Sequence, residues 1–325
     1  MSRSMLCGIV SLAALSSAAP VRGDDAEDRA AAFVETLGGT VTRDPKRPGR
    51  PVVKVALPDT EITFAAPTRE NGFDFPRDDS PRAARKATRG MDAVLKELAP
   101  FKSLTALDLS CTGTTGEGLK ELAALTDLTA LNLYFTKTTD AGLKELAPFR
   151  NLATLYLSGT RVTDAGMKKL AGLKSLARLD LGGTKVTDAG VTELAALPNL
   201  TVLGLFATAV TDAGARDLAA LKGLTELDLG STRVTDAGLK ELAALKKLTT
   251  LNLTNTGVTG TGFRDLASHP SLTALYLCQT KVTGAGLKEL AALTNLTTLD
   301  LSGTAVTDAD VKELQKALPK CKIVR

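Results

Sequence analysis

A unit of 24 residues recurs nine times in this chain without insertion or deletion. Every unit carries three leucines in the pattern L-x-x-L-x-L. The first leucine of the pattern stands at Leu104, Leu128, Leu152, Leu176, Leu200, Leu224, Leu248, Leu272 and Leu296. A fixed period in the range of roughly 20–50 residues is typical of solenoids, in which each unit buries its apolar face against its neighbours. The repeat therefore predicts an elongated stack of units.

The unit at residues 176–199 shows what each repeat is expected to form. Leu179 and Leu181 alternate with Arg178 and Asp180, which is the period-2 mark of a strand with one buried face. A helix is predicted from Thr187, because a threonine can cap a free amide and the acid that follows it complements the helix dipole. The helix has an apolar stripe at a spacing of three residues, formed by Val191, Leu194 and Leu197.

This pattern resembles the leucine-rich repeat family over about residues 52–325, in particular its short, helix-bearing bacterial repeats, and in style also ribonuclease-inhibitor-like repeats and those of F-box partners. The resemblance implies an α/β solenoid: a right-handed horseshoe with parallel strands on the concave face and helices on the convex face. The family usually has Asn or Cys where this chain has threonine, so we expect a threonine ladder that bonds neighbouring backbone more weakly. Those threonines are Thr112, Thr136, Thr160, Thr184, Thr208, Thr232, Thr256, Thr280 and Thr304.

A glycine recurs in the first turn of eight of the predicted helices. Glycine costs about 1 kcal/mol relative to alanine inside a helix. Its recurrence therefore predicts a contact too close for a Cβ atom. These glycines are Gly118, Gly142, Gly166, Gly190, Gly214, Gly238, Gly262 and Gly286.

The two ends of the chain depart from the repeat. Residues 1–23 are interpreted as a signal peptide, because Arg3 precedes an apolar run that is too short to span a bilayer. The predicted organisation continues with a capping helix and linker at 24–51, a first repeat at 52–103 that an insertion at 64–91 interrupts, nine repeats at 104–319, and a capping strand at 320–325. The insertion is either a surface loop or a binding lid.

The charge and the chemistry-bearing residues exclude several function classes. Loss of Arg3 and Arg22 with the signal peptide would lower the formal net charge from +4 to +2, which gives no support to a nucleic-acid partner. The only histidine, His269, stands at a helix end where other repeats have an apolar residue. We find no nucleophile motif, no metal-spaced set of Cys and His, and no phosphate loop. The sequence thus predicts no catalytic residue, metal or cofactor.

The three mature cysteines, Cys111, Cys278 and Cys321, fall on repeats too far apart for a disulfide between them. Cys111 and Cys278 are seven repeats apart, which is roughly 34 Å at the spacing of neighbouring strands. A disulfide needs Cα atoms within roughly 7 Å. Three free thiols are therefore expected.

The predicted concave face carries the most informative side chains. All three tyrosines project from it, and two phenylalanines lie on the same strands or at their ends. Acids outnumber bases there, since Arg178 is the one base. The alternative is that these are ordinary solvated strand residues. The candidate ligand-binding residues are Tyr134, Phe135, Tyr156, Asp180, Phe206, Asp228 and Tyr276.

These observations favour a non-catalytic, exported scaffold, secreted or in the periplasm or cell envelope, that binds a protein or peptide on its concave face as a monomer. Binding of a carbohydrate or cell-envelope polymer is the first alternative, because tyrosines stack on sugar rings. A ubiquitin-ligase-type substrate adaptor is the second alternative, which rests on the resemblance of the repeats alone. No membrane-spanning segment is expected.

Overall fold

The computed structural model describes residues 23–57, 91–266 and 269–325. All but the last residue of the predicted signal peptide (1–23) and all but the last residue of the insertion at 64–91 lie outside the described residues. Within these residues a single twelve-stranded sheet follows the chain order from β1 to β12. The strands are β1 (Thr40–Arg43), β2 (Val52–Ala56), β3 (Ala106–Asp108), β4 (Ala130–Asn132), β5 (Thr154–Tyr156), β6 (Arg178–Asp180), β7 (Val202–Gly204), β8 (Glu226–Asp228), β9 (Thr250–Asn252), β10 (Ala274–Tyr276), β11 (Thr298–Asp300) and β12 (Lys322–Val324).

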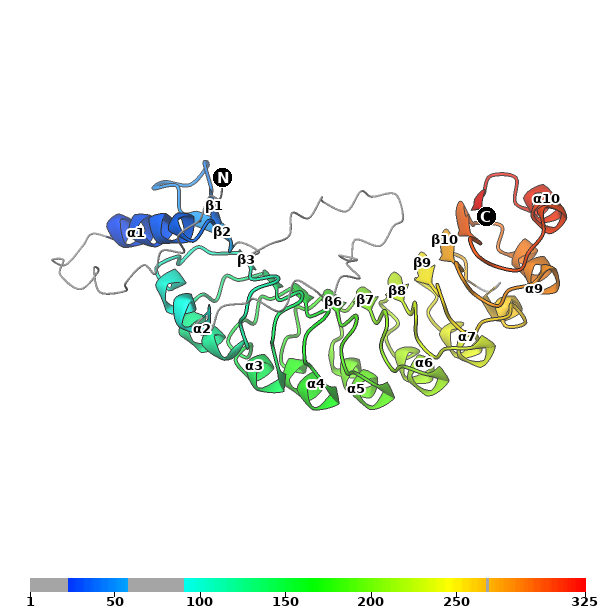
Figure 1. The fold of residues 1–325 in the computed structure, drawn as a ribbon, viewed down its shortest axis with the longest axis horizontal. Helices are drawn as coiled ribbons and strands as arrows, with labels where there is room; N and C mark the ends of the chain where they lie inside the picture. Colours follow the sequence, from blue (N-terminus) through cyan, green and yellow to red (C-terminus); the bar gives the residue numbers. More distant parts are fainter. Residues whose placement is uncertain (1–22, 58–90, 267–268) are drawn as a thin grey trace, which may run out of the picture.

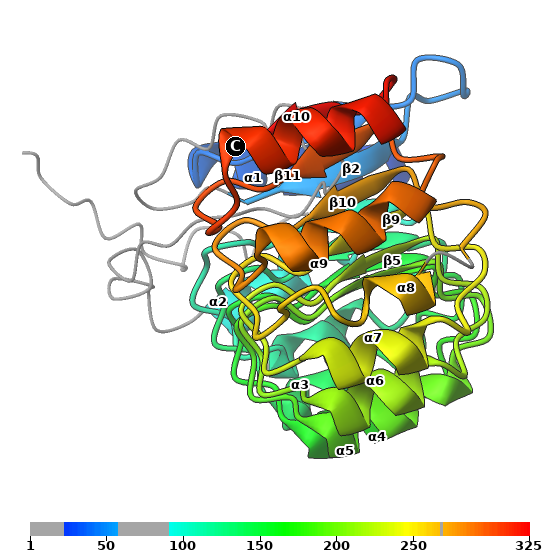
Figure 2. The same cartoon turned by 90° about the vertical axis from the view of Figure 1, so that its right-hand side faces the viewer.

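Each strand from β2 to β11 is followed by a helix on the outer side of the arc (Figure 1), and the helices stack along the convex face (Figure 2). The α-helices are α1 (Gly23–Thr36), α2 (Met91–Val94), α3 (Asp140–Lys144), α4 (Asp164–Leu170), α5 (Asp188–Glu193), α6 (Asp212–Leu218), α7 (Asp236–Leu242), α8 (Phe263–Leu266), α9 (Gly284–Glu289) and α10 (Asp308–Ala317). Short 3-10 helices are η4 (Leu95–Leu98), η5 (Glu117–Leu122), η6 (Leu194–Ala196) and η7 (Leu290–Ala292). The predicted leucine-rich repeat horseshoe is confirmed.

The sheet keeps the 24-residue register of the sequence. Leu131 pairs with Leu155, and Leu155 pairs with Leu179, in parallel strands. The leucines of the repeat are fully buried between the sheet and the helices and form one continuous core along the arc. Each buried leucine side chain contributes about 1.5–3 kcal/mol. Three fully buried phenylalanines join this core, namely Phe101, Phe149 and Phe263.

The N-terminal end contains a strand that the sequence did not predict. β1 lies in the segment interpreted as a capping helix and linker, and it pairs antiparallel with β2, whereas the pairs from β2–β3 onward are parallel. α1 covers the end of the core with Ala30, Ala31 and Val34. Its last turn ends at Thr36, so Leu37 is left 38% exposed.

An aspartate at the start of most helices ties each unit to the next. Asp188 accepts hydrogen bonds from the backbone amide (2.8 Å) and the hydroxyl (2.7 Å) of Thr211, the N-cap of α6. The same pair of bonds links Asp140, Asp164 and Asp212 to the next threonine. These carboxylates therefore stabilise the N-terminus of the following helix.

The glycine column lies where neighbouring helices approach most closely. A Cβ atom on Gly142 would lie 2.5 Å from the carbonyl oxygen of Thr115 and 2.9 Å from the Cα atom of Gly116. A Cβ atom on Gly238 would lie 2.5 Å from a carboxylate oxygen of Asp212. The predicted close contact is thus confirmed for this column.

The threonine ladder differs from the expectation. Thr184 donates its hydroxyl to the carbonyl of Leu181 in its own unit at 2.6 Å, and the equivalent threonines do the same. A different column bonds neighbouring units: Thr225 donates to the carbonyl of Thr201 at 3.1 Å. The physical reason is distance. The hydroxyl of a threonine that follows the strand lies within hydrogen-bond distance of the carbonyl three residues earlier in its own unit, and this local bond competes with bonds to the next unit.

Candidate binding surface

Six neighbouring strands bring six residues into one line across the middle of the concave face. In-register pairing from β5 to β10 places them side by side, so that each follows the next at the spacing of adjacent strands, about 4.8 Å. We call this line the central row. It consists of Tyr156, Asp180, Gly204, Asp228, Asn252 and Tyr276. Its tyrosines stand at the two ends, and its two acids flank a glycine.

The acids and the asparagine of the central row also form the turn that ends their strand, as do the residues at the equivalent position of other units. The Oδ1 atom of Asp180 accepts the backbone amide of Gly182 at 2.9 Å, and Asp228 does the same for Gly230 at 2.8 Å. Such a side-chain bond to the amide two residues on mimics a backbone turn. The same bond occurs at Asp108, Asn132, Asn252 and Asp300.

The turn ends on a left-handed residue in every unit. In all nine units the residue at this position has a positive φ, for example 52° at Phe135 and 62° at Gly183. The column comprises Cys111, Phe135, Gly159, Gly183, Ala207, Ser231, Asn255, Gln279 and Gly303. Non-glycine residues adopt this conformation at a cost, so the surrounding core must hold the turn in place.

Burial sets the electrostatics of the two acids. Loss of hydration raises the pKa of Asp180 to about 7, the amide of Gly182 opposes this, Asp228 adds to it and Arg178 opposes it. Asp180 is 2% exposed and Asp228 is 1% exposed. The strands thus hold two carboxyl groups close enough to influence each other in a poorly hydrated site.

A second line of charges runs beside the central row. Arg178 of β6 and Glu226 of β8 approach to 3.9 Å across Val202, and each side chain is 25% exposed. Arg178 is therefore already close to an acid. The central row keeps an excess of negative charge when Asp180 is ionised.

Asn252 brings a buried donor to the same place. Its Oδ1 atom accepts the amide of Thr254 at 2.9 Å, which fixes the orientation of the side-chain amide. Its Nδ2 atom is fully buried and has no hydrogen-bond acceptor in the part of the chain that the structure describes. A Cβ atom built on Gly230 would lie 3.2 Å from this Nδ2 and 3.1 Å from Oδ1 of Asp228. The donor thus lies next to the acid.

Comparison with known proteins identifies the repeat. A family model described as a leucine-rich repeat region matches residues 84–321. The chain belongs to the leucine-rich repeat family. No curated protein matches it.

Two solved structures are similar to this leucine-rich repeat protein. Internalin C2 from Listeria monocytogenes is 32% identical over 65% of this chain and 83% of that chain, with a TM-score of 0.50. A second internalin from that organism (inlF) is 18% identical over 93% of this chain and 94% of that chain, with a TM-score of 0.50, and it shows the fold alone.

The predicted aromatic residues of this leucine-rich repeat protein lie on the concave side, but they are less exposed than expected. Tyr134 and Tyr276 are buried, at 2% and 6% exposure, and only Tyr156 of the three tyrosines is partly exposed. The rings of Tyr134 and Phe135 contact each other at a centroid distance of 4.6 Å. Phe135 also covers Gly159, and Phe206 covers Gly230 in the same way. These two phenylalanines therefore pack onto a neighbouring glycine as well as lining the face.

His269 has a structural role. It is 3% exposed, and its two ring nitrogens lie 3.2 Å from the carbonyl oxygen of Leu266 and 3.1 Å from that of Leu242. Burial lowers its pKa below 6.5, an effect that the two carbonyls oppose and the charge of Lys246 reinforces. The neutral ring bridges the helical halves of two units and has no acid partner for catalysis among these contacts.

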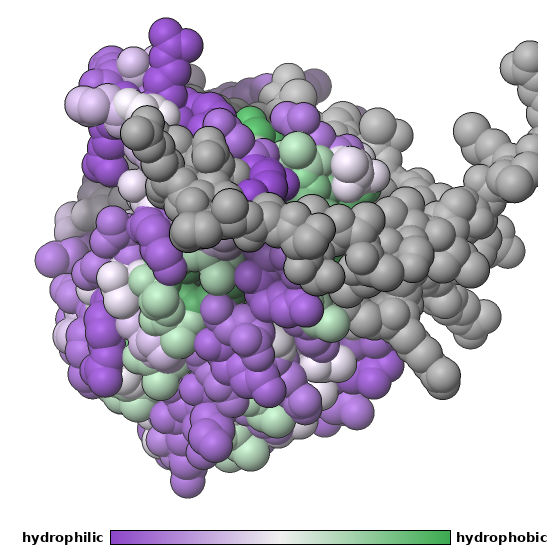
Figure 3. Space-filling view, turned by 90° about the vertical axis from the view of Figure 1, so that its left-hand side faces the viewer, coloured by the Kyte–Doolittle hydropathy of each residue, from purple (hydrophilic) through white to green (hydrophobic). Residues whose placement is uncertain are grey.

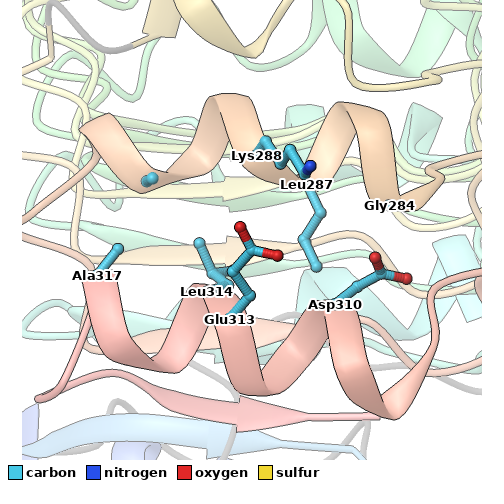
Figure 4. A pocket seen from close by; sticks show the side chains of 8 residues that line it. Gly284, Leu287, Lys288, Asp310, Glu313, Leu314 and Ala317 are labelled. Carbon is cyan, nitrogen blue, oxygen red and sulfur yellow. The ribbon is translucent and has the colours of Figure 1, made fainter.

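A cavity of about 220 Å³ lies between α9 and α10 on the convex face (Figure 4). Asp310 stands where the other helices have the recurring glycine, and it caps α10 together with Thr307. Its carboxylate lies against Gly284, and Leu287 and Leu314 line the floor. The carboxylate of Asp310 thus forms part of the cavity wall.

Other site types find no support in the described residues. No group of three or more His, Cys, Asp or Glu side chains there could hold a metal ion. No helix among them has the length and apolar character needed to cross a membrane. Cys111, Cys278 and Cys321 form no disulfide with one another, as predicted. At the end nearest α1, hydrophilic side chains predominate and apolar ones form only small groups (Figure 3).

Sequence reasoning identified Asp180, Asp228 and the tyrosines as candidate ligand-binding residues, and it placed Asn252 on the concave face without counting it among them. Alignment of the nine units shows Asn252 in the same column as the two acids, and that column was the available signal. Burial of its unpaired donor depends on packing across several strands, which a single repeat does not reveal.

Proposed function

We propose that this chain is a non-catalytic, exported scaffold that holds a protein or peptide on its concave face. Solenoids of stacked repeats create extended concave surfaces that serve for binding. The observation that carries the proposal is the central row, where buried polar groups and aromatic rings gather on one face. Interfaces draw most of their binding energy from such aromatic anchors and desolvated charges.

Export rests on the predicted signal peptide at residues 1–23. The absence of a catalytic role rests on the bonding of the polar residues. Asp180, Asp228 and Asn252 each use one side-chain oxygen in a turn, and the only histidine bridges two helices. A monomer suffices, because α1 with β1 covers one end of the core and α10 covers the other.

Site-specific photo-cross-linking in the native compartment tests the proposal. A photoreactive phenylalanine analogue replaces Phe206 on the concave side, or Lys240 on the exposed surface of α7. We expect protein adducts from position 206 and far fewer from position 240. Adducts from position 240 alone, or an adduct at position 206 that contains glycan and no protein, would contradict the proposed function.

A further inference from the structure

The central row contains a buried donor without an acceptor, at Asn252, and a buried acid, Asp180, that uses only one of its two carboxylate oxygens in a hydrogen bond among the described residues. Oδ1 of Asp180 accepts the amide of Gly182, and its second carboxylate oxygen receives no hydrogen bond within the described residues. Nδ2 of Asn252 donates none. Because buried polar groups in folded proteins are almost always paired, each unmatched group needs an explanation, and a ligand is one.

The spacing of these two atoms fits an extended chain. Asp180 and Asn252 stand three strands apart, which is about 14 Å, the length of about four residues of extended peptide. Asp228 lies between them, one strand from Asn252, and Gly204 contributes no side chain between the two acids. The tyrosines at the ends of the row add contact area for neighbouring residues of the same chain.

The charges favour a cation over a neutral ligand. Asp180 and Asp228 repel each other when both are ionised, and burial raises the pKa of Asp180 to about 7. A lysine or arginine side chain between them relieves this repulsion and stabilises both charged forms, whereas a sugar hydroxyl does not. The neighbouring Arg178 lies within 3.9 Å of Glu226 in the parallel line of charges.

We infer that the central row binds an extended basic segment of a partner protein, with a lysine or arginine side chain held between Asp180 and Asp228 and a main-chain carbonyl oxygen accepting from Nδ2 of Asn252. This inference rests on the proposed function and specifies its partner. The basic side chain reaches the two acids from the side of Arg178 and Glu226, whose side chains are partly exposed.

An array of synthetic nonapeptides tests the inference. One central position carries each amino acid in turn, plus citrulline as the neutral isostere of arginine, in a background of glycine, serine and tyrosine. The full chain should bind peptides with lysine or arginine at least tenfold more tightly than those with citrulline. The double variant Asp180→Asn with Asp228→Asn should lose this preference, because both asparagines keep the oxygen that the turn needs.

Asp300→Asn is the matched control. Asp300 lies in the same column and accepts the amide of Ser302 in the same way, but it stands beyond Tyr276. The Asp300→Asn variant should bind the basic peptides as the unchanged chain does. Equal loss in Asp300→Asn and in the double variant would overturn the inference, since charge alone would then explain binding.

The pH dependence provides an independent readout. Asp180 pairs in register with Tyr156 of β5, and the charged groups that influence it are Arg178 of its own strand and Asp228 of β8. A cation binds the ionised form, so affinity for the basic peptides should fall by up to about tenfold per pH unit below pH 7. Asp180→Asn should flatten this dependence. A dependence that persists unchanged in this variant would contradict the role of Asp180.

Failure of the inference and failure of the proposed function give different results. Peptides that bind without a basic preference, together with protein adducts at position 206, would overturn the inference and leave the proposed function standing. Binding of no peptide, together with no protein adduct at position 206, would overturn both.

Discussion

The same acidic residue type serves two purposes in one column of this solenoid. Asp108 and Asp300 accept an amide in the turn and remain partly exposed, whereas Asp180 and Asp228 make the same bond at 1–2% exposure. The turn bond uses one carboxylate oxygen and accounts for the residue type at all four positions. The burial of the central two needs a further reason, because burial of a charge is unfavourable.

Asp180→Asn should stabilise the folded chain at alkaline pH. The pKa of Asp180 is raised from 3.8 to about 7 in the folded state, so the folded state holds its proton more tightly than the unfolded state. The stability from this group is complete below pH 3.8 and is lost as pH rises to about 7. The loss amounts to up to about 4 kcal/mol, at about 1.4 kcal/mol per pKa unit.

Urea unfolding at pH 5 and pH 8 measures this effect. The variant should exceed the unchanged chain in stability at pH 8, and the difference should shrink at pH 5. A variant that is less stable at pH 8 would contradict the burial of an unpaired carboxyl group. Asp300→Asn controls for the chemical change itself.

His269→Leu should reduce the loss of folding stability that occurs when the pH falls from 7 to 5. Burial holds the pKa of His269 below 6.5, so this group contributes stability that is present above pH 6.5 and lost as pH falls through its folded-state pKa. Leucine occupies the equivalent positions 245 and 293 and does not titrate. Melting temperatures at pH 7 and pH 5 should show a smaller drop for the variant than for the unchanged chain. Equal drops would contradict the lowered pKa, because they would show that His269 binds its proton as readily in the folded state as in the unfolded state.

At the scale of elements, two helices depart from the common form where a glycine with a positive φ replaces the aspartate of the first turn. Asp164 and Asp188 cap the next helix, and α5 and α6 begin at the expected residue. Where glycine replaces the aspartate at Gly116, the unit forms only the 3-10 helix η5. At Gly260 the helix α8 begins three residues late and has four residues. Both glycines have a positive φ, 86° and 105°.

Asp188→Ala should destabilise the chain by removing the hydrogen bonds that link Asp188 to Thr211 of the next unit. The change leaves the amide and the hydroxyl of Thr211 without their acceptor, which costs about 1–3 kcal/mol. Asp188→Asn keeps one acceptor oxygen and should cost less. Urea unfolding of both variants measures the difference. Asp188→Ala with unchanged stability would show that water replaces the carboxylate without loss.

Gly142→Ala should destabilise the chain through overpacking. The added Cβ would meet the carbonyl oxygen of Thr115 at 2.5 Å, and backbone atoms cannot move aside cheaply. We expect a loss of about 1–3 kcal/mol. Gly172→Ala is the control, because its Cβ would meet only a side-chain nitrogen of Arg150, at 4.0 Å. Equal stability of the two variants in urea unfolding would refute the close approach of the helices.

Features that are encoded within a single unit could be predicted from the sequence, whereas features that depend on contacts between units could not. Strand and helix were predictable because leucine spacing changes from two to three within each unit. β1 was not, since Thr40–Arg43 has no fully buried position and depends on pairing with β2. The concave residues were predictable as a face. Burial of Tyr134 and the unpaired donor of Asn252 were not, because they depend on contacts between units.

At the scale of the whole molecule, stacking of the 24-residue units forms an extended concave face. Each unit adds one strand to the concave face in fixed register, so a residue in one unit has a defined distance from its equivalents. The central row spans β5 to β10 and gives an extended partner several attachment points. No single unit contains the site, and its specificity comes from the few positions at which the units differ.

The affinity of the protein that cross-links at position 206 tests the central claim most directly. It should be titrated against the unchanged chain, against Tyr156→Ala with Asp228→Asn in the central row, and against Lys144→Ala with Lys240→Ala on the exposed helices. We predict a loss of at least tenfold for the first pair and no change for the second. Loss confined to the helix pair would contradict recognition by the concave face.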